Sequence, residues 1–518
     1  MAIKILWADD EIDMFKPSIL YLKEKGYEVI SVTNGKDALD KVETEAIDVV
    51  FLDESMPGLT GLETLLRIKE KHSHLPCVMI TKNEEENLME DAIGSQISDY
   101  LIKPVKPQQI LSTLKKVIDS SRLISEKTSS NYQKEFQALF MHMQDNLDFN
   151  QWADLYKKLV YWEIELDNSD AGQMKEVFNA QKDEANKEFN KFITKNYRTW
   201  LKNEAPNDAP VMSHSLLKNK LFSLLKEDKP TFLILIDNLR FDQWKAIQPA
   251  MTNLFRMEEE DIFYSILPTV TQYSRNAIFA GMMPLEIQKK FPDRWIMDDE
   301  EEGKNLNEDF FLGDLLKRTF RDEIKHQYIK ITNHRDGEAL ENNMLNYLNN
   351  KLTVIVYNFV DMLSHARTEM EVLKELASDE AAYRSLAVSW FDHSPLQNAL
   401  KKIADENVNV LVTTDHGTVR VKNPSKCIGD RQTTTNIRYK TGKNLAYEEK
   451  DVFAVKNPDE ILLPKGNLTS SYIFAKESNY LVYQNNYNHF ANFYRNTFQH
   501  GGISLEEVLV PVVTLSSK

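Results

Sequence analysis

Five short apolar runs, each followed by a stretch with helical periodicity, constrain the fold of the first 120 residues. The runs read IKILWA, YEVISV, DVVFLD, PCVMIT and DYLIK, and the loops around them are short. Runs of this length are typical of strands buried on both faces, and their alternation with helices favours a parallel sheet. Residues 1–120 are therefore predicted to form a doubly wound α/β domain, with its site at the carboxyl ends of the strands.

Polar side chains gather where these predicted strands end. Asp9 and Asp10 follow the first run, Asp53 ends the third, Thr81 ends the fourth and Lys103 ends the fifth. Three clustered carboxylates repel one another unless a cation lies among them, and oxygen ligands of this kind suit Mg²⁺. A lysine and a hydroxyl at the same place would then stabilise a phosphoryl group on Asp53.

This segment resembles the response-regulator receiver family over its whole length. The similarity rests on the acid pair at 9 and 10, on LDESMPGLTG around the third strand, and on the threonine, tyrosine and KP pair nearer its end. It implies a flavodoxin-like fold in which Asp53 is the phosphoacceptor. The other implied roles are Mg²⁺ binding by Asp10 and Asp53 with support from Asp9, a switch pair of Thr81 and Tyr100, and phosphoryl contact by Lys103.

Lys82 is a departure from that family, which usually has a small residue beside the phosphoryl pocket. The difference bears on the lifetime of the phosphorylated state. It does not bear on whether phosphorylation occurs, since no member of the pocket is missing.

Length and charge limit the number and kind of domains that the remaining 398 residues can form. A chain of 518 residues is too long for one core, so two to four domains are expected. The net charge of −16 argues against a broad DNA-binding surface, and no helix-turn-helix pattern is found. No apolar run approaches the ~18 residues that span a bilayer, and the acidic start is not that of a signal peptide. The two cysteines form no disulfide framework, which favours a cytoplasmic location.

Residues 121–205 are predicted to form an all-α helical connector. Apolar and aromatic residues recur there at three- and four-residue steps, in three sets that begin near Phe136, Trp152 and Met174. Such stripes are ordinarily the core of packed helices, and we favour that interpretation. The alternative is that they also provide a dimer surface or a lever for the phosphorylation signal.

A second α/β domain is predicted over residues 206–518. TFLILID, DIFYSIL, LTVIVYNFV and NVNVLVTTD have the length and composition of buried parallel strands. Asp237, Asp361 and Asp415 lie at or just after the ends of such runs, where they would share one crevice. Carboxylates gathered there raise one another's pKa, and mixed Asp and His sets suit Zn²⁺. The nearby imidazoles are those of His365, His416 and His500.

The candidate nucleophile is Thr271, in the segment ILPTVTQYSRNAIFAGMMP. A proline and two threonines precede a helix-like stretch, so this residue is predicted to open a helix. Free N–H groups at a helix start suit an anion, and metal coordination would lower the pKa of the hydroxyl. Each polar residue taken alone is more often a cap, a turn residue or a satisfied histidine. The ordered appearance of all of them favours one site.

This order of motifs resembles the alkaline-phosphatase superfamily, and most closely its PglZ branch. The similarity rests on LILIDNLRFD, LPTVTQYSR, DMLSHARTEM, TTDHG and HGGISLEEVLVP. It implies an alkaline-phosphatase-like α/β fold that binds two Zn²⁺ ions, with Thr271 attacking phosphorus. The implied ligands of the nucleophile's metal are Asp237, Thr271, Asp415 and His416, and those of the second metal are Asp361, His365 and His500.

A basic segment comes directly after the TTDHG motif. Between Arg420 and Lys443 there are seven Lys or Arg residues and a single acid, in a chain that is acidic elsewhere. Positive charge beside the metal site would favour an extended anion such as an oligonucleotide. Composition alone supports a solvated loop equally well. The candidate substrate-binding residues are Arg420, Lys422, Arg431 and Arg438.

Over its full length the chain resembles the PorX-type response regulators. The similarity implies a sensor histidine kinase as partner, dimerisation on phosphorylation, a role in type IX secretion, and phosphodiesterase action on cyclic or linear oligonucleotides. The leading hypothesis is a phosphorylation-controlled zinc phosphodiesterase. The alternative is a non-catalytic regulator whose metal-bound domain binds a protein such as a sigma factor.

Overall fold

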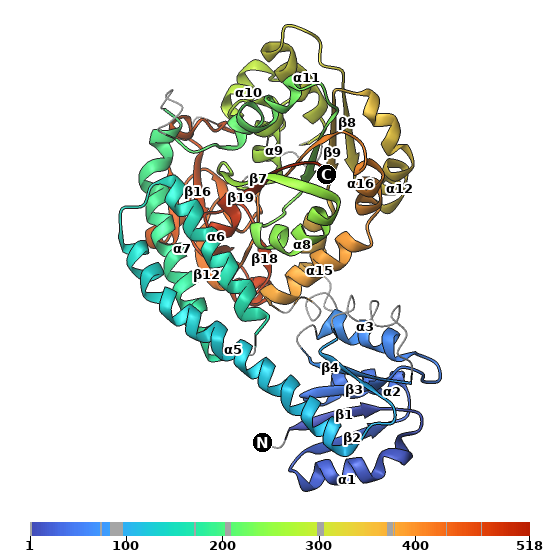
Figure 1. Ribbon diagram of the computed structural model, residues 1–518. Coiled ribbons are helices and arrows are strands. Elements are labelled where there is room, and N and C mark those ends of the chain that lie inside the picture. The colour runs from blue at the N-terminus through green and yellow to red at the C-terminus, as the bar shows by residue number, and fades with distance from the viewer. Residues whose placement is uncertain are drawn as a thin grey trace. The chain divides into compact units, whose positions relative to one another are not determined.

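The computed structural model describes residues 3–72, 75–82, 97–169, 172–202, 209–297, 305–369, 377, 379–430, 433–467 and 469–518. The chain forms two compact units (Figure 1). The N-terminal unit comprises Met1–Ala138 and Trp162–Phe178, and the C-terminal unit comprises Leu139–Tyr161 and Asn179–Lys518.

A five-stranded parallel sheet forms the centre of the N-terminal unit, and all five predicted strands are confirmed. The strand order is β2-β1-β3-β4-β5. The strands are β1 Lys4–Ala8, β2 Glu28–Val32, β3 Val49–Asp53, β4 Cys77–Thr81 and β5 Asp99–Ile102. The helices that the structure describes around them are α1 Lys16–Glu24, α2 Gly35–Thr44, α3 Gly61–Lys71 and the start of α5 Pro107–Gln144.

The two faces of this sheet bury separate apolar clusters. On β1, Ile5 and Trp7 belong to the cluster that α1 and α5 complete, whereas Leu6 and Ala8 belong to the cluster that α2 and α3 complete. Alternate side chains of a strand point to opposite faces, so a strand buried on both sides must be apolar throughout. This explains the uninterrupted apolar runs in the sequence.

The two cysteine thiols are buried, one in each unit, and are not joined in a disulfide. Burial raises the pKa of Cys77 to about 12 and also raises the pKa of Cys427. Because the thiolate is the reactive form, we expect neither thiol of the native protein to react with Ellman's reagent at pH 8. Both should react once the chain is unfolded in guanidinium, and rapid labelling of either thiol in the native chain would contradict this burial.

Three long helices follow the first sheet, as the apolar stripes predict. They are α5, α6 Phe149–Asp167 and α7 Gly172–Trp200, and each has residues in both units. Most of the predicted stripe is buried, including Trp152, Phe189 and Tyr197, whereas Phe140 and Val177 are exposed. The stripes are therefore mainly helix-packing surface. α5 is continuous across residue 120, where the sequence predicts the first domain to end.

A six-stranded mixed sheet forms the centre of the C-terminal unit. Its order is β7-β19-β10-β6-β9-β8, with β10, β6, β9 and β8 parallel to one another. These strands are β6 Thr231–Ile236, β7 Phe255–Tyr264, β8 His326–Ile331, β9 Leu352–Tyr357, β10 Asn409–Thr413 and β19 Leu509–Ser517. The adjacent strands β10, β6 and β9 are those predicted from the runs that precede Asp415, Asp237 and Asp361.

DIFYSIL is largely buried and its first four residues end a strand, as predicted, but the predicted parallel pairing is wrong. The segment ends β7, an edge strand that pairs antiparallel with β19 and leaves the sheet at Tyr264. β8 and β19 were not predicted. β8 lies at the other edge and is partly exposed along most of its length, whereas β19 directly follows a polar motif, so neither begins as an isolated apolar run.

Helices and three small sheets surround this central sheet. The helices are α8 Phe241–Leu254, α9 Thr271–Ala280, α10 Pro284–Lys290, α11 Glu308–Thr319, α12 His334–Asn343, α13 Phe359–Glu369, α15 Glu380–Asp392, α16 Pro395–Ile403, α17 Tyr487–Tyr494 and α18 Leu505–Val508. The first small sheet pairs β11 Val419–Arg420 with β18 Phe498–Gln499. In the second, β12 Asn423–Ile428 lies between β14 Ala446–Tyr447 and β17 Asn479–Tyr483. In the third, β16 Ser471–Ala475 lies between β13 Tyr439–Gly442 and β15 Val452–Val455. Within the described ranges, every helix is too short or too polar to cross a membrane.

Candidate phosphoacceptor site and metal centre

The carboxyl ends of β1, β3 and β5 bring together the first predicted site. Asp9, Asp10 and Asp53 offer carboxylate oxygens that lie within 4.8 Å of one another. Nζ of Lys103 lies 2.9 Å from Oδ2 of Asp9 and 2.6 Å from Oδ1 of Asp53. Asp9 and Asp53 are buried and Asp10 is exposed, so a cation could approach from the solvent side.

The charges in this pocket are those expected of a site that accepts a phosphoryl group and binds a cation. Burial raises the pKa of Asp53, Lys103 opposes the rise, and Asp9 adds to it. Burial lowers the pKa of Lys103, but Asp53 and Asp9 outweigh this effect and raise it. The lysine therefore stays charged beside two acids, where its positive charge partly offsets their repulsion.

The other predicted residues of this site lie around its rim. The hydroxyl of Thr81 hydrogen bonds to the carboxylate of Glu54, and Tyr100 is 41% exposed. Lys82, the departure from the family pattern, forms an exposed ion pair with Glu11 at 3.2 Å. The switch role of Thr81 and Tyr100 stays a prediction.

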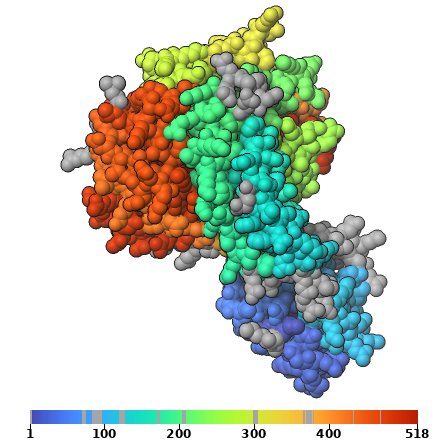
Figure 2. Space-filling model, turned by 90° about the vertical axis from the view of Figure 1, so that its left-hand side faces the viewer, coloured from blue at the N-terminus to red at the C-terminus, as the bar shows by residue number. Residues whose placement is uncertain are grey.

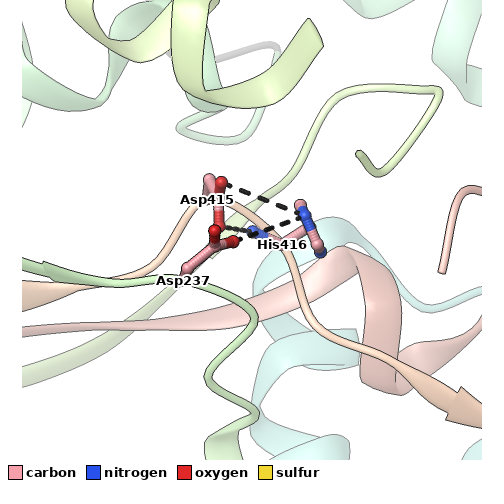
Figure 3. Close-up of side chains that lie close together, drawn as sticks. All are labelled: Asp237, Asp415 and His416. Atoms are coloured by element: carbon pink, nitrogen blue, oxygen red, sulfur yellow. Dashed lines mark hydrogen bonds and ion pairs between the residues drawn. The ribbon is translucent and has the colours of Figure 1, made fainter. Parts of the chain in front are cut away.

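Three ligand-type side chains converge at the carboxyl ends of β6 and β10. Asp237 follows β6 directly, and Asp415 and His416 follow β10 (Figure 3). Their donor atoms all lie within 4.8 Å of one another, and all three residues are buried. Nε2 of His416 lies 3.9 Å from a carboxylate oxygen of each aspartate.

Thr271 is the first residue of α9, as predicted, and its hydroxyl faces this cluster. Oγ1 lies 3.2 Å from Nε2 of His416 and 3.5 Å from Oδ1 of Asp237. Thr271 is partly exposed, in contrast to the buried aspartates and histidine behind it. The hydroxyl can therefore meet a substrate from solvent while it remains in contact with the ligand cluster.

Asp361 and His500 form the described part of the second predicted group. Nε2 of His500 lies 3.6 Å from Oδ1 of Asp361, and the rings of His500 and His416 stack with centroids 4.3 Å apart. The two groups are therefore adjacent. The predicted third ligand, His365, lies on α13, but its side chain is outside the described residues.

The donor chemistry of both groups suits zinc. Nδ1 of His416 is 3.1 Å from the carbonyl oxygen of Gly417, and Nδ1 of His500 is 3.2 Å from that of Thr269. A carbonyl oxygen only accepts, so each Nδ1 carries the proton and each Nε2 presents a lone pair to the cluster. Nitrogen and carboxylate donors in this state are the ligands that Zn²⁺ takes in proteins.

Arg275, which the sequence analysis missed, supplies the positive charge of the cluster. Its guanidinium is fully buried on α9 and forms ion pairs with Asp237 and with Asp415, the latter at 2.9 Å. It also lies 3.5 Å from Glu308. Arg275 comes four residues after Thr271, so the two are neighbours on one face of the helix. That spacing is the signal that could have indicated it.

The pKa values of the two aspartates beside Arg275 shift in opposite directions. Burial raises the pKa of Asp237 well above its ordinary value, Arg275 opposes this, and Asp415 and Asp361 add to it. Burial also acts to raise the pKa of Asp415, but Arg275 and the backbone N–H of Asn238 outweigh it and lower the pKa. Asp415 is therefore the more firmly ionised partner.

The short helix α18 holds the two segments that carry His416 and His500. The N–H of Gly417 donates to the carbonyl of Glu507 at 3.2 Å, and the N–H of Gly502 donates to Oε1 of Glu507 at 2.9 Å. A Cβ on Gly417 would lie 2.0 Å from the carbonyl oxygen of Glu506. Close approach to α18, rather than a positive φ angle, is therefore what requires glycine after the histidine.

The prediction that Arg438 binds substrate is wrong. Its guanidinium is fully buried and makes two bonds to Glu507, at 3.1 Å and 2.5 Å. Lys422 is exposed and donates to Asp183 of α7 at 3.0 Å, a weak surface pair that leaves it a candidate. Arg420 on β11 is partly exposed and remains a candidate, and Arg431 lies outside the described residues.

Three families match consecutive parts of the chain. Residues 216–515 match the BREX system PglZ alkaline phosphatase-like domain. The chain belongs to the PglZ family. Residues 5–115 match the response regulator receiver domain, and residues 122–201 match the PorX response regulator linker domain. A receiver, this linker and a PglZ domain, in that order, make the chain a PorX-type response regulator.

Individual relatives match a smaller part of this PglZ protein than the three family models do. The chain is 31% identical over 122 residues to the alkaline phosphatase synthesis transcriptional regulatory protein PhoP of Bacillus subtilis, which is 23% of this chain and 50% of PhoP. It is 32% identical over 115 residues to the regulatory protein VanR of Enterococcus faecium, which is 22% of this chain and 49% of VanR. The chain thus spans about half the length of these curated relatives. Among solved structures, chemotaxis response regulator CheY4 of Vibrio cholerae is 28% identical, with 23% of this chain and 99% of CheY4 covered and a TM-score of 0.22.

Proposed function

We propose that this response regulator is a zinc-dependent phosphodiesterase whose nucleophile is Thr271. The observation that carries the proposal is the position of the Thr271 hydroxyl, 3.2 Å from His416 and 3.5 Å from Asp237, at a partly exposed helix start. The family supports a phosphoesterase relationship, and the ligand chemistry supports the metal.

Each residue of the cluster has a definite task in this proposal. Asp237, Asp415 and His416 with Thr271 would hold one zinc ion, and Asp361 and His500 with His365 would hold the other. Zinc in such sites lowers the pKa of a bound hydroxyl and neutralises charge on phosphate oxygens. The first turn of α9 offers free N–H groups that suit an oxygen of the bound phosphate, so Thr271 is placed beside the anion it would attack.

An aromatic pocket supports a nucleotide-containing diester as substrate. A cavity of about 250 Å³ is lined by residues that include Tyr357, Phe359 and Trp390. Phe359 and Trp390 stack with ring centroids 4.5 Å apart. The pocket lies beside the last residues of β8 and β9, at the sheet edge that carries the ligands, and Phe359 is two residues before Asp361. A flat nucleobase fits such a surface.

Trp390→Ala should weaken the binding of a nucleotide substrate through its base. For metal-loaded Thr271→Val protein, we expect the Kd for dithymidylate to rise roughly 10-fold, as loss of one stacking contact predicts. The Kd for the abasic analogue of the same dinucleotide should not change. Phe310→Ala, which removes an exposed ring outside this pocket, is the matched control. An equal loss of affinity for both ligands would exclude a base-stacking role.

The receiver supplies the proposed control. A sensor histidine kinase would phosphorylate Asp53, and phosphorylation would promote a homodimer and change the activity of the PglZ domain. The match to the PorX response regulator linker domain supports a regulatory role, and we propose type IX secretion as the process that is regulated.

Metal content and ester hydrolysis test the function together. We expect mass spectrometry to find about two zinc ions per chain, and we expect turnover of bis-(p-nitrophenyl) phosphate to exceed that of p-nitrophenyl phosphate. Acetyl phosphate should change the diester rate of the wild type and leave that of Asp53→Asn unchanged. Tight zinc binding without turnover of either ester would refute the enzyme and support a regulator that binds a protein such as a sigma factor.

A further inference from the structure

A groove lined by lysines runs between α7 and the segments around β15 and β16. Its volume is about 460 Å³, and its walls carry Lys187, Lys191, Lys195, Lys450 and Lys476 together with Asn190, Thr194 and a single acid, Glu477. In Figure 2 the green surface of α7 lies along the orange surface of the later segments. Five lysines in one concavity contrast with the net charge of −16 of the chain.

The α7 wall presents its lysines at four-residue spacing, so they form one stripe on the helix. Lys187 pairs with Glu184 at 3.2 Å and Lys191 pairs with Glu188 at 2.5 Å, and in each pair the lysine is exposed and the glutamate partly exposed. Exposed pairs of this kind are weak, so a ligand of higher charge can displace them. Lys195 forms no ion pair with the residues that the structure describes.

The opposite wall adds partly buried charge. Lys476 follows β16, and burial lowers the pKa of its amine. Burial also raises the pKa of the neighbouring Glu477, which Lys187 and Lys476 oppose. Lys450 belongs to the short turn of helix at Glu449–Asp451. The charged form of a partly buried amine with one adjacent acid is stabilised when an anion enters the groove.

The groove adjoins the backbone that carries His500. Ile503 exchanges hydrogen bonds with Ala475 and Glu477, at 2.9 Å and 2.8 Å. Asn186 of α7 accepts from the N–H of Leu505 at 2.8 Å, so both walls contact the segment after the HGG motif. The groove is nevertheless distinct from the metal centre, because none of the proposed metal ligands whose side chains the structure describes lines it.

We propose that this groove is a second binding site, which takes the phosphate chain of a polyanion. Among the described residues, the lining has lysines spread along a groove and no aromatic side chain, so it would hold successive phosphates rather than bases. An oligonucleotide backbone and a linear polyphosphate share this chemistry. The proposal does not depend on catalysis by Thr271.

Equilibrium binding to the full chain tests this site. The probes are fluorescein-labelled hexathymidylate and, as unlabelled competitor, sodium tripolyphosphate, with Thr271→Val as the background so that no probe is hydrolysed. To this background we add the triple change Lys191→Ala, Lys195→Ala and Lys476→Ala. We expect the Kd of this variant for hexathymidylate at 50 mM salt to rise at least 10-fold. The slope of log Kd against log salt should fall by about 2, as loss of three phosphate contacts predicts.

A matched triple change isolates the groove from general charge. Lys218→Ala, Lys226→Ala and Lys401→Ala remove the same charge from exposed positions outside the groove, and this variant should bind like its parent. Competition by tripolyphosphate would show that phosphates alone are recognised, and competition by oligonucleotides alone would assign the site to a nucleic acid backbone. The proposal is overturned if both triple variants bind alike, or if the parent binds neither probe with a Kd below about 1 mM.

Discussion

Thr271→Val should abolish phosphodiester hydrolysis while zinc remains bound. Valine keeps the branched shape of threonine and removes the hydroxyl, so α9 and its first turn should be unchanged. Asp237, Asp415 and His416 stay in place to hold the metal. Loss of a nucleophile costs several orders of magnitude in other hydrolases, so we expect kcat to fall roughly 1,000-fold or more. Hydrolysis of bis-(p-nitrophenyl) phosphate and zinc content are the two measurements.

Thr271→Ser is the control for this change, because it restores a hydroxyl at the same atom position. It should retain diester hydrolysis within roughly 10-fold of the wild type, since the helix start and the ligands are the same. A valine variant with wild-type turnover would remove Thr271 as nucleophile and leave the zinc site without its proposed reaction. A valine variant that loses zinc would show instead that the hydroxyl serves mainly as a ligand.

Arg275→Met should destabilise the metal-free protein more than any other single change considered. Methionine fills similar space but leaves Asp237 and Asp415 buried without their shared positive charge, while Glu308 keeps its ion pair with Lys330. Removal of one partner from a buried ion pair costs about 3–5 kcal/mol. Urea unfolding of the C-terminal unit, monitored by tryptophan fluorescence in the presence of a chelator, should show this loss. Added zinc should restore part of it, because the cation replaces the missing charge.

Arg256→Met is the matched control for Arg275→Met. Arg256 pairs with Glu258 on β7 at 2.6 Å, and both side chains are exposed. Surface pairs contribute about 0–1 kcal/mol, so this variant should unfold close to the wild type. If both arginine variants unfold at the same urea concentration, Arg275 does not support the aspartate cluster in the way that its contacts indicate.

The ligand cluster could be predicted because its members follow recognisable strands. Asp237 and Asp415 come directly after short apolar runs, and parallel strands bring such ends together. Arg275 could not be predicted in the same way. Its partners are 38 and 140 residues distant in the chain, and only the fold shows that α9 is buried from Gln272 to Ala280. An arginine on an isolated helix is ordinarily exposed.

Arg438 shows why local charge does not identify a binding surface. The segment from Arg420 to Lys443 is basic by composition, but the acid that neutralises Arg438 is Glu507, which lies 69 residues further on. Counting charges along the sequence therefore overestimates the positive potential of the folded segment. The groove of α7 shows the reverse case. Its lysines come from three separated segments, so the fold makes it basic although no single stretch of sequence predicts it.

The path of the chain between the two units has a consequence for how the protein can be divided. The chain passes from one unit to the other after residues 138, 161 and 178, so the N-terminal unit is assembled from two separate stretches. Tyr132 packs on Trp162 and Phe178 within that unit, with ring centroids 5.4 Å and 5.9 Å apart. A fragment that begins after residue 120 would carry this aromatic cluster without the sheet of its own unit. No single cut therefore yields two complete modules, and exchange of receivers between such proteins, by engineering or by recombination, must transfer the linker helices as well.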